Sequence, residues 1–153
     1  MNQAIDATAH LCRTIVEASS DAIIFADRGG LIRLWNRGAE LVFGYSAAEA
    51  VGQSLDIIIP ERLRRAHWNA FDESVETGRT KHTDRVLTTR AVHKSGDKLY
   101  VDLSFGLARD ASGIPQGAFA VGRDCTARYL AERAMKARVQ ELEASLEAAS
   151  RTT

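Results

Sequence analysis

The chain has 153 residues, of which 45% are hydrophobic, and its 20 acidic side chains balance its 20 basic ones. A chain of this length buries one hydrophobic core, which predicts a single domain with helical extensions. The zero net charge gives no sign of a nucleic-acid surface, and no apolar run is long enough to span a membrane. Cys12 and Cys125 lie in unrelated contexts, as is typical of a reducing compartment, and the N-terminus lacks a secretion signal. We therefore expect a cytoplasmic protein.

The first predicted elements are a leading helix and a β-hairpin. Within residues 1–18, apolar side chains recur at helical spacing at Leu11, Ile15 and Val16. Residues 22–26 and 31–35 are apolar and β-branched or aromatic, and Gly30 lies in the turn between them. We expect residues 1–18 to form an N-terminal helical cap, followed by a hairpin that opens the main domain.

Two short helices are predicted after the hairpin, because each begins at a side chain that can cap it. Asn36 and Ser46 offer oxygens to the first free backbone N–H groups of these helices. Glu40 and Glu49 follow in or near the first turns, where a negative charge stabilises a helix.

A longer helix and three strands are predicted next. The helix runs from about Pro60 to Glu76 and ends at Gly78, since proline suits the start of a helix and glycine its end. Strands are expected at residues 83–92, 99–108 and 117–122. The middle strand alternates, with one face formed by Leu99, Val101, Leu103, Phe105 and Leu107. Together with the hairpin, these strands predict a five-stranded antiparallel sheet.

The last predicted element is a helix within residues 125–153, capped by Asp124 or Thr126. Apolar residues recur at coiled-coil spacing at Met135, Val139, Leu142 and Leu146. This spacing favours a parallel dimer helix, which predicts a homodimer formed through this helix and the N-terminal cap. The same register extended backward places Arg128 and Glu132 in the seam, so an amphipathic helix folded over its own sheet remains an alternative.

The stretch after the leading helix resembles the PAS domain family. The positions that carry the resemblance are Asn36, Glu40, Phe43, Gly44, Tyr45, Glu49 and Gly52, and the similarity continues to about Thr126. The resemblance implies an α+β fold in which small helices cover one face of a five-stranded antiparallel sheet. It implies a sensor domain over residues 19–124 and a signalling or dimerisation helix over residues 125–153.

Within that family, the long helix resembles the haem-binding branch of gas sensors. The run from Pro60 through Glu61 and Arg64 to His67 matches the segment in which a histidine holds haem iron. The resemblance implies haem b with His67 as the metal ligand, and an apolar lining from Leu103 and Phe105. One lineage of the family carries a distal arginine at the position of Leu87, and another carries a sulfur ligand at the position of Arg85.

The distal side of this predicted site departs from the family. Because strand side chains repeat every two residues, Arg85 and Leu87 are expected on one face. We expect Arg85 to bond a bound gas or a haem propionate, with Leu87 crowding the site. His82 is either a second iron ligand or a solvated loop residue.

Two functions therefore follow from the sequence. The first is a PAS sensory signalling module that binds a ligand, with haem b and a diatomic gas as the specific expectation. Its C-terminal helix would transmit the change to a partner or effector domain. The alternative is a cofactor-free PAS module for dimerisation or protein interaction. An enzyme is not expected, because the chain lacks a phosphate-binding loop and paired catalytic carboxylates.

Overall fold

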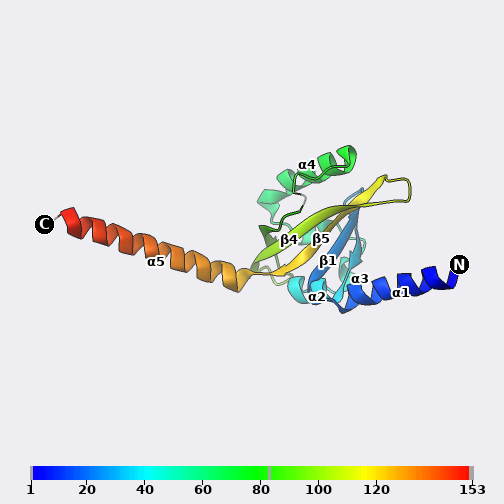
Figure 1. Ribbon diagram of the computed structural model, residues 1–153, viewed down its shortest axis with the longest axis horizontal. Helices are drawn as coiled ribbons and strands as arrows, with labels where there is room; N and C mark the ends of the chain where they lie inside the picture. Colours follow the sequence, from blue (N-terminus) through cyan, green and yellow to red (C-terminus); the bar gives the residue numbers. More distant parts are fainter. Residues whose placement is uncertain (1, 83, 152–153) are drawn as a thin grey trace.

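The computed structural model describes residues 2–82 and 84–151 and has the α+β architecture predicted from the sequence (Figure 1). Its antiparallel sheet has five strands in the order β2-β1-β5-β4-β3. The strands are β1 (Ala22–Asp27), β2 (Ile32–Trp35), β3 (Leu87–Val92), β4 (Lys98–Arg109) and β5 (Pro115–Asp124). The helices are α1 (Asn2–Ala18), α2 (Arg37–Phe43), α3 (Ala47–Ala50), the 3-10 helix η1 (Leu55–Ile57), α4 (Glu61–Thr77) and α5 (Thr126–Arg151).

Strand β3 is shorter than the predicted strand at residues 83–92. It begins at Leu87, and Thr83 lies outside the described residues. Asp84 has a φ of 63°, which is the left-handed region. Because an extended strand needs a negative φ, the backbone at Asp84 ends the strand conformation before Leu87.

The predicted caps at Asn36 and Ser46 are confirmed, and the Asn36 cap also joins three elements. Its side-chain oxygen accepts hydrogen bonds from the Ala39 N–H at 2.9 Å and the Ile23 N–H at 2.8 Å. Its amide nitrogen donates to the carbonyl oxygens of Val16 at 2.8 Å and Asp21 at 3.0 Å. The fully buried Asn36 therefore links the end of α1, strand β1 and the start of α2.

The second cap is a reciprocal pair at the start of α3. Ser46 accepts from the Glu49 N–H, and the Glu49 carboxylate accepts from the Ser46 N–H at 2.8 Å. Gly44 ends α2 in the left-handed conformation, as Gly78 ends α4.

The hydrophobic core lies between one face of the sheet and the helices that follow the hairpin. The alternation predicted for β4 is confirmed: Leu99, Val101 and Leu103 are buried, while Phe105 and Leu107 on the same face are half-buried. The main cluster joins Ile24, Ile32 and Trp35 of the hairpin to Phe43 of α2 and Ile58 beyond η1. The part of the core between the sheet and the short helices is therefore well packed, whereas the space between the sheet and α4 is packed less densely.

Helices α1 and α5 extend away from the domain toward opposite ends of its long axis (Figure 1). No described residue of α5 is buried, and Met135 and Leu146 of the predicted seam are 71% and 70% exposed. The alternative of a helix folded over its own sheet is therefore wrong for this structure, because its apolar stripe touches no sheet. None of the described helices combines the length and the apolar character that crossing a membrane requires.

Candidate functional site

A cavity of about 150 Å³ lies between the inner face of the sheet and α4. Its walls are almost entirely apolar, and the polar exceptions are His67, Thr89 and Arg90. A second cavity of about 230 Å³ adjoins it farther along α4. The two cavities share His67, Phe71, Thr89, Phe105 and Ala118. They form one apolar region with His67 between its two parts.

The cavity exists because small side chains of the sheet face large side chains of α4. Ala26, Ala118 and Ala120 lie on the inner face of β1 and β5 and leave space above the strands. Leu63, His67, Phe71 and Val75 recur at intervals of four residues, which places them on one face of α4. Only Phe71 and Val75 of this helix are fully buried. Helix α4 is thus held over the sheet by a narrow apolar contact.

His67 is the polar group at the centre of this region. Its ring lies edge-on to Trp68 at a centroid distance of 4.7 Å and is tilted to Phe71 at 6.1 Å. Its Nδ1 is buried and has no hydrogen-bond partner within the described part of the chain. Burial lowers the pKa of His67 below its ordinary value, although the charges of Asp56 and Asp72 act in the opposite direction. A neutral imidazole with an unpartnered buried nitrogen is therefore available to a ligand.

Most of the predicted site residues lie together in the structure. His67, Leu103 and Phe105 line the first cavity, and Leu87 lines the adjoining one. His82, which the sequence left as either a ligand or a loop residue, also lines the adjoining cavity. The predicted site is therefore split across two connected spaces rather than gathered around one.

Arg85 is the exception, because it is exposed and lines neither cavity. The prediction that it shares a face with Leu87 required both residues to lie in a strand, and the strand begins only at Leu87. Its guanidinium instead donates to Nδ1 of His82 at 2.9 Å. In this arrangement Arg85 does not reach a ligand in the cavity directly.

Sequence reasoning did not assign Leu63, Phe71 or Thr89 to the site. The signal for the first two was available, because they lie four residues before and four residues after His67 on the same helix. Thr89 carried no such signal, since its place in the lining depends on how β3 is positioned relative to α4.

The residues around His67 fit an imidazole-ligated haem in chemistry but not in volume. The neutral ring supplies an axial donor, and the apolar walls suit a porphyrin. The two adjoining cavities, of about 150 Å³ and about 230 Å³, together reach only the lower end of the range of about 300–1,000 Å³ that is usual for organic ligands. A group as large as haem requires α4 to move away from the sheet.

Comparison with known proteins places the chain in a family. The model of the PAS fold matches residues 16–130. The sensor protein FixL from Bradyrhizobium diazoefficiens is 32% identical over 142 residues, which cover 91% of this chain and 26% of FixL. The chain thus spans about a quarter of the length of that relative.

Two solved structures show the same fold at lower sequence identity. The PAS domain of a protein from Colwellia psychrerythraea has a TM-score of 0.65 at 23% identity, covering 78% of this chain and 98% of that one. An RNA-binding light-oxygen-voltage receptor has a TM-score of 0.68 at 17% identity, covering 86% of this chain and 37% of that one. With its five-stranded sheet, its capped small helices and a family match over most of its length, the chain belongs to the PAS fold family.

Proposed function

We propose that this PAS domain is a sensory signalling module that binds a ligand in the cavity beside His67 and transmits the change through α5. The observation that carries the proposal is that β4 contributes side chains both to the wall of the cavity and to the contact with α5. Val101 and Leu103 point into the cavity from one face of the strand. Tyr100, which precedes Val101, and Asp102, which lies between Val101 and Leu103, are on the opposite face of β4. Both contact the start of α5.

The contacts between β4 and α5 are numerous and short. The rings of Tyr100 and Tyr129 stack at a centroid distance of 3.9 Å. The Tyr100 N–H donates to the Thr126 hydroxyl at 2.9 Å, and the Cys125 N–H donates to the Tyr100 carbonyl at 2.8 Å. The Arg128 guanidinium donates to the Asp102 carboxylate at 2.5 Å. A displacement of β4 therefore changes the position of the first turn of α5.

A ligand acts on this path only if it favours one arrangement of β4 and α5 over another. The cavity is small and α4 is held by a narrow contact, so a ligand larger than the cavity changes the spacing between α4 and the sheet. The ligand therefore has different contacts, and a different binding free energy, in the two arrangements, and this difference shifts the position of α5.

The specific ligand we propose is haem b, with His67 as the iron ligand. Haem held by an imidazole supplies an iron atom that binds a diatomic gas. Within this chain, His67 offers the donor, Leu103 and Phe105 offer apolar walls, and Leu87 borders the adjoining space. The resemblance of the segment from Pro60 to His67 to haem-binding PAS domains supports the same ligand.

Titration with hemin tests this proposal. The purified protein is expected to develop a Soret band at one equivalent, and His67→Ala is expected to lose most of it. His10→Ala, which changes an exposed histidine of α1, serves as the control and is expected to bind like the parent protein. A parent protein that takes up no hemin, or a His67→Ala variant with an unchanged spectrum, contradicts haem as the ligand.

We also propose that the module is a homodimer formed through α5 and α1, which regulates an effector domain or a separate signalling protein. The support is the exposed apolar residues of both helices, Ile5, Leu11, Ile15, Met135, Val139, Leu142 and Leu146. Leu142→Glu is expected to give a monomer in size-exclusion chromatography with light scattering. Ala144→Glu, on the opposite side of α5, is expected to leave the dimer intact.

A cofactor-free dimerisation module is the second candidate, and the same exposed stripes favour it. The two candidates differ in one result. Hemin uptake that depends on His67 supports the sensor, whereas a dimer without any hemin uptake supports the interaction module.

A further inference from the structure

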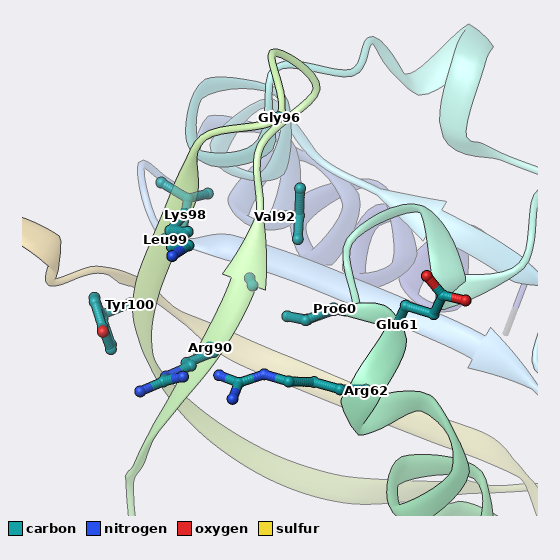
Figure 2. Close-up of a pocket in the computed structure, with 10 residues that line it drawn as sticks. Pro60, Glu61, Arg62, Arg90, Val92, Gly96, Lys98, Leu99 and Tyr100 are labelled. Atoms are coloured by element: carbon teal, nitrogen blue, oxygen red, sulfur yellow. The ribbon is translucent and has the colours of Figure 1, made fainter.

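A larger hollow lies outside the core, between the first turn of α4 and the hairpin of β3 and β4 (Figure 2). Its volume is about 650 Å³, within the range of about 300–1,000 Å³ that is usual for small-molecule sites. It is a more open groove than the cavity that His67 lines, and the two share the lining residues Arg90 and Ala91. The proposed sensor mechanism places no ligand in it.

Three basic side chains from three elements line this groove. Arg62 comes from α4, Arg90 from β3 and Lys98 from β4. Figure 2 shows the side chain of Arg62 extending toward Arg90, whose guanidinium group lies on the side of Tyr100, while the carboxylate of Glu61 is turned away from both. Within the described part of the chain, none of the three forms an ion pair.

The presence of three like charges along one groove favours an anion there. Two guanidinium groups that line one groove without an acidic partner repel, and a bound anion replaces that repulsion with charge-assisted hydrogen bonds. The planar arginine groups match phosphate and carboxylate oxygens in geometry, and Lys98 adds a third charge. A group with two or more negative charges therefore fits this end of the groove best.

The floor of the groove is apolar. Pro60, Val92 and Leu99 contribute hydrocarbon surface beside the basic side chains. A purely inorganic anion leaves this surface uncovered, whereas an organic anion covers it. We propose that the groove binds a small organic polyanion, either phosphorylated or polycarboxylic, through Arg62, Arg90 and Lys98.

The position of the groove gives such a ligand a route to the output helix. A neighbouring hollow shares Arg62, Arg90 and Tyr100 with the groove and is also lined by Tyr129 of α5. Arg90 lies 5.7 Å from the centre of the Tyr100 ring, whose stacking partner is Tyr129. An anion that draws Arg90 toward itself changes the contact of Arg90 with the Tyr100 ring. The groove is thus an effector site beside the start of α5, distinct from the interior cavity.

Titration with ADP and with citrate tests this inference, with binding measured by calorimetry and by amide chemical shifts. Saturable binding of ADP alone indicates a phosphorylated ligand, and binding of citrate alone indicates a polycarboxylic one. Arg62→Gln and Arg90→Gln are each expected to weaken binding at least about tenfold, the loss typical of one charge-assisted hydrogen bond. Arg65→Gln, on the same helix but outside the groove, is expected to change it less than twofold.

The outcomes separate this site from the interior cavity. Binding that is unchanged in His67→Ala supports an independent groove, whatever the result of the hemin titration. Absence of binding by both ADP and citrate overturns the inference. An equal loss in Arg65→Gln also overturns it, because the effect is then general charge attraction rather than a site.

Discussion

Replacing His67 by leucine is expected to stabilise the protein while removing its proposed ligand donor. The imidazole has a buried Nδ1 with no partner among the described residues, in a region whose walls are otherwise apolar. An unsatisfied buried polar group costs about 1–3 kcal/mol, and leucine occupies a similar volume without that cost. We therefore expect His67→Leu to raise the free energy of unfolding by about 1–3 kcal/mol.

The stability gain is expected to depend on pH. The folded pKa of His67 lies below its ordinary value because burial disfavours the charged ring. The unfolded chain therefore takes up a proton first as the pH falls. The parent protein has its full stability above the ordinary histidine pKa of about 6.5 and loses stability as the pH falls toward the folded value. The difference between His67→Leu and the parent should be larger at pH 5 than at pH 8.

Urea unfolding followed by circular dichroism at both pH values measures this difference. His10→Leu changes an exposed residue of α1 and is expected to shift the free energy of unfolding by less than about 0.5 kcal/mol. A His67→Leu variant that is less stable than the parent at pH 8 refutes the reasoning, because His67 must then form a stabilising bond that this arrangement lacks. A gain that is equal at both pH values refutes the lowered pKa.

Two further substitutions probe the attachment of the helices to the sheet. Asn36→Ala is expected to lower the free energy of unfolding, measured by urea unfolding, by about 3 kcal/mol or more. The reason is that it leaves several buried backbone groups without a hydrogen-bond partner. Asn69→Ala, at an exposed position of α4, is the control and should leave the free energy of unfolding nearly unchanged. Asp102→Asn is expected to speed deuterium exchange in the first turn of α5, because it weakens the bond between Asp102 and Arg128. The control Glu132→Gln removes the other ion-pair partner of Arg128 and should leave the contact between α5 and β4 in place. Equal exchange in both variants contradicts an anchoring role for Asp102.

The hydrogen bonds of Asp102 also predict how acid affects the attachment of α5. The hydrogen bond from the Thr88 hydroxyl, together with the Arg128 charge, lowers the pKa of Asp102 below its ordinary value. The contribution of Asp102 is therefore present above the ordinary aspartate pKa and is lost as the pH falls through the folded one. Lower protection factors in the first turn of α5 below about pH 4, after correction for the intrinsic pH dependence of amide exchange, are the expected sign, and Asp102→Asn should remove that change.

The local parts of the fold were predictable because their causes lie within a few residues. The caps at Asn36 and Ser46 and the alternation of β4 depend on side chains next to the backbone that they affect. The placement of Arg85 was not predictable, because the left-handed backbone at Asp84 interrupts a stretch whose composition favours a strand. The cavity volume depends on how α4 packs over alanines of β1 and β5, which are distant in sequence.

In the proposed mechanism, the single strand β4 is the element that couples the cavity to α5. Leu103 in the cavity wall and Asp102 at the base of α5 are adjacent in the chain, so the backbone cannot shift at one without shifting at the other. The ladder with β5 pairs Leu103 with Gly122, where a side chain would meet the backbone of Asp102. That close approach leaves β4 and β5 little freedom to slide separately. In the proposed mechanism, a ligand that presses on Leu103 therefore moves the two strands together, and α5, which follows β5 directly and is bonded to β4, moves with them.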